Sequence, residues 1–560
     1  MLAEAIGEDA FRARLLDWLE QSARVRPTPE WPTIPPATGD ILRGLAWGCG
    51  GFGDEEAARV LAELGLAAFR RTPGFGPRSA KVGNACALVL AQLPGDAGVA
   101  QLLRLRSTVY AASARRALDA ALDDVARRHG APPAELEERA VPDYGLSPEG
   151  VGSQRVDGYV AEIRARGPGA VELIWRRPDG RVQRAPPAKL RRGRPNAVER
   201  VERTARDARA MLSAQRRRLE RFFLLEPQWP LPDWRERYHD HGLVATLARR
   251  LIWVFRSDGT SHAALWCDDR FVDVHGRPVR APSKGATVTL WHPVHAQPQE
   301  RRGWRSLLER LQITQPFKQA HREVFEPIAG DHPDDPSTTR YAGRRLRQGQ
   351  LTALCRSRGW RYVPQPAWGS RDPPVLRIPE RDLEVVLEII APDGPPVGGA
   401  PFYEWVTSGP VFFRRADGSG VALRDVPRVV LSEALRDVDL FVGVAGRGQP
   451  GQPSGGAHLE TRREVLRTLL PRLPLTARGE VADESLLLEG RDATYQFDLV
   501  TGEPAKLPDG QPVELRPERL AQASRLGEGV LPFLGDDTLA RLVAESLAIA
   551  GAPEHLAIDA

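Results

Sequence analysis

Apolar and polar positions alternate with helical periodicity over the first 130 residues of the chain. Alanine and leucine recur at spacings of three and four, and short turns rich in glycine and proline separate the segments. The predicted helices cover residues 8–24, 40–49, 54–70, 80–93, 96–104 and 112–129. Residues 1–140 are therefore predicted to form a helical domain.

Antiparallel helix pairs of this length resemble an α-solenoid of the HEAT type, although no strict repeat is present. Arrays of this kind offer a curved docking surface, so we expect a protein partner to bind through this domain. An ordinary helical domain is an equally good interpretation of the same pattern.

Beyond residue 140, short strands alternate with helices. Residues 159–164 and 171–175 alternate as strands do, and Asp179-Gly180 marks a hairpin turn, which predicts a small β-meander within 141–195. Residues 196–330 are predicted as a mixed helix/strand domain. Its expected elements are an amphipathic helix over 196–223, a buried helix over 243–254, and strands at 263–266, 270–274 and 286–291.

A polar, proline-rich stretch at 331–339 has the composition of a linker. Residues 331–560 are predicted as a C-terminal α+β domain. Its expected elements are helices at 340–358, 460–471 and 536–549, strands near 383–390, 411–414 and 437–444, and a hairpin around 484–500. The predicted fold class is thus α+β and multidomain, with a helical HEAT-like array followed by a mixed α/β core with small antiparallel sheets.

Composition excludes several classes of protein. The 560 residues carry 78 basic and 73 acidic side chains, so the formal charge is only +5, and nucleic-acid binding is possible but not indicated. The four cysteines are far apart and form no C-x-x-C pair, so no metal or disulfide framework is expected. No apolar run approaches 18 residues, and the chain starts without a basic targeting region. We therefore expect a cytoplasmic protein with no membrane contact.

The stretch TQPFKQAHREVFEP at residues 314–327 is the strongest candidate for a binding site. Two prolines suit the start and the end of a short helix, and Lys318, His321 and Arg322 then share one face at i, i+3 and i+4. Three potential cationic donors on one helix favour a phosphate or a carboxylate. The predicted anion site consists of Gln315, Lys318, His321 and Arg322.

Lysine is scarce in this chain, which strengthens the choice of Lys318. The other lysines are Lys81, Lys189, Lys284 and Lys506, while arginine supplies the remaining positive charge. A retained lysine is a candidate for a role that needs a compact ammonium group. The alternative for Lys318 is a surface position or a salt bridge to Glu323 or Glu326, and Lys81 is a secondary candidate.

Acidic residues on expected strands allow a second kind of site. Glu384, Asp437 and Asp439 alternate with aliphatic residues, as metal-binding carboxylates of a nuclease could, although amphipathic strands commonly show the same alternation. The pairs His239/His241 and His292/His295 have spacings that could chelate zinc, although structural hydrogen-bonded histidines are commoner. Glu384, Asp437, Asp439 and His292 are therefore secondary candidates, and no metal site is assigned.

Residues 446–451 match the G-x-G-x-x-G pattern, but Pro450 and Pro453 prevent the helix that a dinucleotide site needs. No Walker A, G-x-S-x-G or H-E-x-x-H motif is present. The sequence therefore assigns no catalytic residue and no cofactor.

Seven segments together are similar to one bacterial family. They are GPRSAKVGN at 76–84, RRLIW at 249–253, LWHP at 290–293, QPFKQAHRE at 315–323, RDLEVVLEI at 381–389, SEALRDVDLFVGVA at 432–445 and TRREVL at 461–466. The chain resembles domain-of-unknown-function family 4132, whose members are sometimes labelled molybdate-metabolism-regulator-like and in some cases carry a WGR domain. We expect this chain to lack that module.

The resemblance implies association with bacterial conflict gene clusters, beside MoxR-type ATPases and von Willebrand A-type proteins. It names no reaction, so two hypotheses remain open. The first is a noncatalytic scaffold or regulatory protein of a bacterial conflict or stress system, with an anion site at Lys318, His321 and Arg322. The second is an enzyme acting on a phosphate-containing or nucleic-acid substrate, with His321 as an acid or base.

Overall fold

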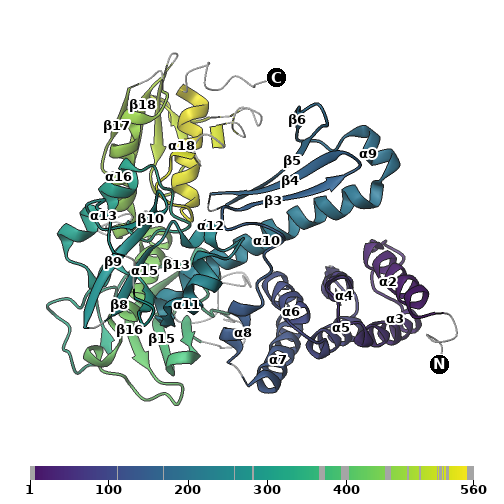
Figure 1. The fold of residues 1–560 in the computed structure, drawn as a ribbon. Coiled ribbons are helices and arrows are strands. Elements are labelled where there is room, and N and C mark those ends of the chain that lie inside the picture. Colours follow the sequence, from purple (N-terminus) through teal and green to yellow (C-terminus); the bar gives the residue numbers. More distant parts are fainter. Residues whose placement is uncertain are drawn as a thin grey trace.

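The computed structural model has a helical array at its N-terminal side and a mixed core built on several small antiparallel sheets (Figure 1). This confirms the predicted fold class at that level. The structure describes residues 7–550 except for short gaps at 73, 110, 131, 168, 258, 281–282, 365–371, 393–402, 448–455, 476–477, 491–492, 514, 516–519, 521–522 and 525–528. Within these residues, no helix combines the length and the apolar character needed to cross a bilayer.

The helical array contains the predicted N-terminal helices and a short additional one. They are α2 (Glu8–Arg24), α3 (Pro36–Gly48), α4 (Glu55–Phe69), α5 (Ala80–Gln92), α6 (Ala97–Thr108), α7 (Ala112–His129) and α8 (Pro133–Arg139). Helices α2, α4 and α6 pack in one layer, and α3, α5 and α7 pack in a second, around one continuous apolar core. Local signals fix the helix ends, since the Asp54 carboxylate caps α4 and Gly130 ends α7 in the left-handed conformation.

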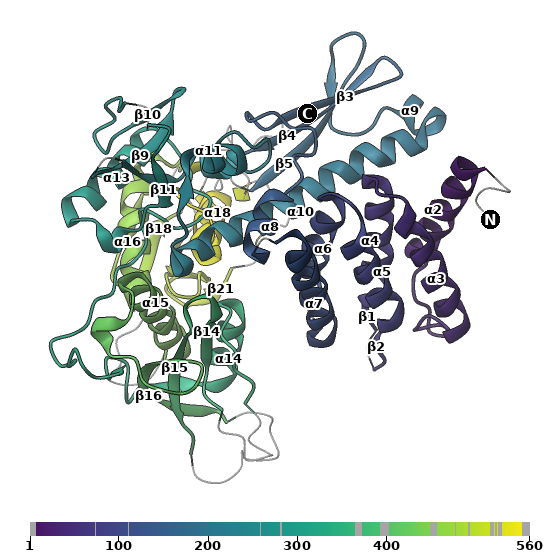
Figure 2. The same ribbon diagram turned by 60° about the horizontal axis from the view of Figure 1, so that its bottom comes forward.

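A four-stranded antiparallel sheet and a long helix follow the array, as predicted for residues 141–223. The strands are β3 (Val151–Val156), β4 (Tyr159–Arg166), β5 (Ala170–Arg176) and β6 (Val182–Gln183), and the helices are α9 (Ala188–Gly193) and α10 (Pro195–Leu225). The apolar face of α10 packs on this sheet around Trp175, Val198 and Val201. In Figure 2, α10 runs along one side of the helical array.

The second sheet has the order β10-β9-β8-β11-β7 and is antiparallel throughout. Its strands are β7 (Trp229–Pro230), β8 (Ile252–Ser257), β9 (Thr260–Cys267), β10 (Arg270–Val272) and β11 (Thr287–Leu290), and α13 (Pro298–Arg310) follows. The predicted helix over 243–254 is wrong, because only α12 (Ala245–Ala248) is helical and β8 begins at Ile252. A continuous apolar run does not distinguish a buried helix from a buried strand by periodicity.

The third sheet combines β12 (Ser337–Thr338), β13 (Arg345–Arg347), β14 (Val375–Ile378), β15 (Leu383–Ile390) and β16 (Trp405–Arg414). The stretch 331–339 is not a free linker, because β12 pairs with β16 and the Leu423 amide donates to the Asp335 carbonyl. The predicted helix 340–358 starts only at α14 (Gln348–Ser357), since β13 takes the residues before it.

The predicted strand at 437–444 is also wrong, because those residues belong to α15 (Arg428–Ala445). This helix contacts α10, α14, β13 and α16 (Gly456–Leu469), so it lies at the centre of the mixed core. Its buried positions include Ala434, Val438, Phe441 and Ala445, which follow the helical spacing of three and four.

The C-terminal part is an antiparallel meander, in the order β17 to β21, packed against two helices. Its strands are β17 (Gly479–Val481), β18 (Ser485–Glu489), β19 (Thr494–Asp498), β20 (Pro504–Lys506) and β21 (Gln511–Pro512). Helices α16 and α18 (Asp537–Ala550) share one apolar core with these strands. The predicted hairpin and both predicted helices of this part are confirmed.

Candidate functional site

The predicted helix at residues 314–327 does not form. The segment is an irregular, largely buried strip that forms a parallel bridge from Gln315 to Phe533. The Gln315 amide donates to the Pro532 carbonyl, and the Leu534 amide donates to the Gln315 carbonyl, both within 3.0 Å. A helix of about ten residues is marginal on its own, so these distant partners decide the conformation.

Two glutamine side chains supply hydrogen bonds that a helix would have made internally. Gln315 Oε1 accepts from the Ala320 amide at 2.9 Å, and the fully buried Gln319 side chain bonds both the amide and the carbonyl of Ile252. Gln319 Nε2 also donates to the Trp291 carbonyl. Buried backbone groups require such partners, so the glutamines fix the segment to the second sheet.

The two cations of the predicted site face the protein's own carboxylates. Lys318 Nζ lies 2.5 Å from Glu323 Oε1, which confirms the salt-bridge alternative for this lysine. Arg322 makes a two-pronged contact with Glu433 at 2.5 and 2.6 Å, and it also donates to Glu220 at 2.9 Å. Lys318 and Arg322 are 6% and 2% exposed, so neither is open to an external anion as the predicted site requires.

Helix α15 supplies most of the partners. Glu433 pairs with Arg322, Arg436 donates to Glu323 at 2.8 Å, and Asp437 accepts from Arg358 at 2.6 Å. These side chains form a buried charge cluster of four cations and four carboxylates. Its members are Glu220, Lys318, Arg322, Glu323, Arg358, Glu433, Arg436 and Asp437.

Glu323, Glu433 and Arg322 of this cluster are held in their charged forms by their partners. Burial alone would raise the pKa of Glu323, but the charges of Lys318 and Arg436 outweigh burial and lower that pKa well below its usual range. The pKa of Glu433 is lowered well below its usual range by Arg322, again against the effect of burial. Burial alone would lower the pKa of the Arg322 guanidinium, but the charges of Glu433 and Glu220 outweigh burial and raise it.

His321 is 1% exposed, and its ring lies 5.2 Å from that of Phe533. Its Nδ1 has no hydrogen-bond partner among the described residues. Burial lowers the pKa of His321 to about 3, and the charges of Arg305 and Lys318 add to that shift. The imidazole is therefore neutral at physiological pH, in contrast to the charged donor expected from the sequence.

The secondary candidates do not come together with this segment into an open site. His292 is buried, its Nε2 lies 3.1 Å from Glu433 Oε1, and its Nδ1 accepts from the Val294 amide. Glu384 pairs across the third sheet with Arg377 and Arg414. Lys81 is exposed in the first turn of α5, within the helical array.

The two aspartates of α15 have structural partners. Asp437 accepts from Arg358 and from the Trp360 indole, and Asp439 accepts from the Tyr341 hydroxyl and from the Ala457 amide at the start of α16. Among the described residues, no group of three or more His, Cys, Asp or Glu side chains is arranged to hold a metal ion. The geometry therefore gives the nuclease hypothesis no support.

The remaining histidine pairs are also hydrogen-bonded groups. His239 Nδ1 lies 2.7 Å from Asp240, and His241 Nε2 lies 2.9 Å from the Val141 carbonyl. His295 contacts Glu226 at 3.1 Å. These contacts bear out the structural alternative for them.

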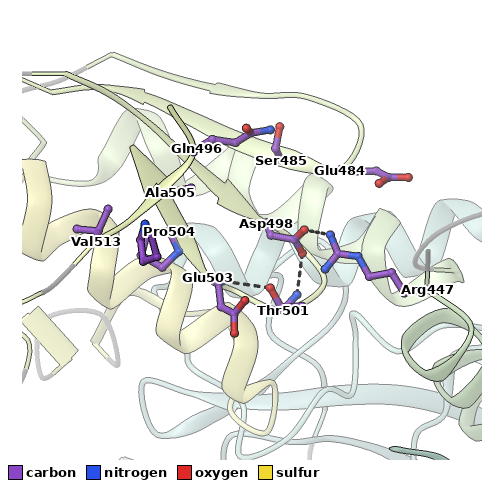
Figure 3. A pocket seen from close by; sticks show the side chains of 12 residues that line it. Arg447, Glu484, Ser485, Gln496, Asp498, Thr501, Glu503, Pro504, Ala505 and Val513 are labelled. Atoms are coloured by element: carbon purple, nitrogen blue, oxygen red, sulfur yellow. Dashed lines mark hydrogen bonds and ion pairs between the residues drawn. The ribbon is translucent and has the colours of Figure 1, made fainter. Parts of the chain in front are cut away.

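A cavity of about 820 Å³ opens on the C-terminal sheet (Figure 3). Arg447 and Asp498 point toward each other there and form an ion pair, and Asp498 also accepts from the Val500 and Thr501 amides. These contacts hold the turn between β19 and β20. The G-x-G-x-x-G pattern of residues 446–451 begins directly after α15 with Gly446. Its residues 448–451 lie outside the described residues.

A second cavity, of about 420 Å³, was not predicted from the sequence. It is lined by Arg249 and Arg250 from the turn after α12, and by Trp266 and Cys267 at the end of β9. The sequence feature that could have indicated this cavity is the pair of arginines inside the otherwise apolar run 243–254. Its chemistry is treated below.

The thiols provide a test of this arrangement. Cys49, Cys86 and Cys355 are buried, and burial raises the pKa of Cys49 to about 12, whereas Cys267 is only partly buried. We expect iodoacetamide to modify one thiol in the native protein and all four in denaturant, because reaction needs an accessible thiolate. Peptide mass mapping should locate the native adduct at Cys267, and modification of a second thiol at a similar rate would contradict the packing of the other three.

Two family models match the chain. Residues 180–360 match a domain of unknown function (DUF4132), and residues 459–552 match a second domain of unknown function (DUF7737). The first match confirms the family resemblance predicted from the sequence, over residues 180–360. No curated protein and no solved structure matches this chain.

The charge cluster lies partly inside the first matched range and partly between the two ranges. Lys318, Arg322 and Arg358 lie in the DUF4132 range, while Glu433 and Arg436 lie on α15, between the two matched ranges. The cluster therefore joins the DUF4132 domain to the central helix of the core.

Proposed function

We propose that this chain is a noncatalytic scaffold or regulatory protein, of the HEAT-like type predicted, that docks a protein partner on its N-terminal array. The observation that carries the proposal is the layer formed by α3, α5 and α7, whose outer face carries exposed apolar side chains. The buried charge cluster of the mixed core pairs its cations with carboxylates of the same chain, which favours a structural role over an open reaction centre.

Helix α10 contacts the layer of the array that contains α2, α4 and α6. Glu20 of α2 accepts from Arg203 at 2.7 Å, and Arg104 of α6 pairs with Asp207 at 2.9 Å. Figure 2 shows α10 running along this side of the array. The outer face of the α3, α5 and α7 layer is thus the side that a partner can reach.

That outer face carries large apolar groups. Ile41 and Trp47 of α3 are 64% and 45% exposed, and Leu88 of the neighbouring α5 is 49% exposed. Among the described residues, seven of the twelve exposed large hydrophobic side chains lie within residues 18–88. A concentration of this kind is typical of protein interaction surfaces, where aromatic side chains supply much of the binding energy.

The first partners to test are a MoxR-type ATPase and a von Willebrand A-type protein, which the family resemblance implied. We expect one of them to bind the purified chain, and Trp47→Ala to weaken binding by about tenfold or more, since a central Trp commonly contributes ~2 kcal/mol or more. Isothermal titration calorimetry measures the change.

Trp18→Ala is the matched control, because Trp18 is equally exposed but lies on α2, in the layer that contacts α10. A loss of binding in both variants, or in neither, would contradict the assignment of the docking face. Absence of binding by both partner classes would remove the resemblance-based choice of partner.

A further inference from the structure

The cavity of about 420 Å³ lies where four parts of the fold meet. The turn after α12 forms one wall, the β9–β10 turn forms another, and residues Leu311 and Ile313 after α13 form a third. The β4–β5 end of the first sheet closes it, with Ala165 and Gly167 in the lining. A volume of this size is within the range of small-molecule sites, ~300–1,000 Å³.

Arg250 distinguishes this cavity from the charge cluster. Its guanidinium is half-buried, and within the described part of the chain no carboxylate lies within ion-pair distance of it. Burial lowers the pKa of Arg250, and no opposing acid offsets that effect. A half-buried guanidinium without a carboxylate lacks its usual charge partner, which a bound anion would provide.

Arg249 adds a second cation beside it. Its Nε donates to the His239 carbonyl at 2.9 Å, which holds the side chain in place. Its nearest carboxylates, Glu149 and Asp240, are 3.8 and 3.9 Å away, so the guanidinium keeps donors for a ligand. The group also lies 5.7 Å from the Trp266 ring centroid, which orients it against an aromatic wall of the cavity.

The other lining residues restrict the chemical class of ligand that the cavity can bind. Leu311, Ile313 and Trp266 offer an apolar surface, which suits the organic part of a molecule rather than a free ion. Glu149 and Asp268 also line the cavity and would repel a polyanion, but they accept hydrogen bonds from hydroxyl groups. A ligand with one oxyanion and several hydroxyl groups could pair its oxyanion with the arginines and donate from its hydroxyl groups to Glu149 and Asp268.

We propose that this cavity binds a small organic phosphate of the sugar phosphate or nucleoside monophosphate class. Arg249 and Arg250 hold the phosphate, and Trp266 contacts the organic part. The site does not depend on the docking function proposed above, since it lies on the mixed core and not on the helical array. Its ligand is a candidate regulator of the scaffold.

Calorimetric titration with AMP, ribose 5-phosphate and inorganic phosphate tests the site. At least one organic phosphate should bind more tightly than inorganic phosphate, and Arg250→Gln should weaken that binding by about tenfold or more. Arg256→Gln is the matched control, because Arg256 is an exposed arginine of β8 outside the cavity, and it should bind as the wild type does.

Cys267 gives an independent readout, because its thiol lines the same cavity. The bound phosphate should slow alkylation of Cys267 severalfold in the wild type and leave the rate unchanged in Arg250→Gln. The charge-retaining Arg250→Lys variant keeps the comparison valid if the glutamine variant unfolds, and it should bind more tightly than the glutamine variant. The proposal is overturned by equal binding in the Arg250 and Arg256 variants, by inorganic phosphate binding as tightly as both organic phosphates, or by no binding at about 10 mM.

Discussion

Replacing Glu433 with alanine should lower the free energy of unfolding by about 3–5 kcal/mol. The substitution leaves the guanidinium of Arg322 buried with only Glu220 as a carboxylate partner, and it removes the contact of His292. Arg322 is 2% exposed, so water cannot replace the lost carboxylate. Urea unfolding followed by circular dichroism measures the change.

The matched control removes both charges together. In the double variant Arg322→Met with Glu433→Leu, apolar groups of similar volume replace the buried pair. Glu220 loses its contact with Arg322, but its side chain is 30% exposed and can be solvated. We expect this variant to be more stable than Glu433→Ala, because replacing a buried ion pair by apolar groups is often close to neutral. An effect of Glu433→Ala below about 1 kcal/mol, the scale of an exposed ion pair, would contradict the burial of the cluster.

The elements that the sequence predicted correctly are those with local signals. The helices of the array have regular apolar spacing and recognisable ends, such as Asp54 before α4 and Gly130 after α7. The same holds for α10, α16 and the hairpin of β18 and β19, whose patterns extend over enough residues to select one period.

Helix α15 shows how a short window misleads. Asp437 and Asp439 alternate with Val438 and Leu440, which fits a strand over these few residues. Over all 18 residues the buried positions follow helical spacing, and the two aspartates bond Arg358 and the start of α16. The tertiary partners of a charged residue are not encoded in its local pattern.

The candidate site shows the same limit more strongly. The residue types at 314–327 indicated a dense group of cations, and that group exists. Its partners come from residues 100 and more positions away, Glu220 on α10 and Glu433 on α15, so only the Lys318–Glu323 contact was open to prediction. Pairing converts the expected ligand site into a structural junction. Within the described residues, a cation without a carboxylate at ion-pair distance occurs instead at Arg250, beside Arg249 in the smaller cavity.

The second prediction with a large effect concerns the free energy of unfolding as a function of pH, and it depends on the protonation of His321. The folded-state pKa is about 3, whereas an exposed histidine titrates near about 6.5, so between these values the unfolded chain binds a proton that the folded chain does not. Stability is therefore fully present above about pH 6.5 and falls as the pH is lowered, by about 1.4 kcal/mol per pH unit for this one group. Acidic carboxylates such as Glu323 and Glu433, whose pKa values are lowered, add their losses only below about pH 4.3.

Urea unfolding of the wild type and of His321→Gln between pH 4.5 and 8 separates these contributions. The variant should lose about 1.4 kcal/mol less per pH unit below about pH 6.5, while the two proteins show parallel profiles above it. The variant is not expected to become independent of pH, because burial also lowers the pKa values of His239, His292 and His458. Identical slopes for the wild type and His321→Gln would show that solvent reaches His321 in the folded protein, and the junction at residues 314–327 would then be open rather than sealed.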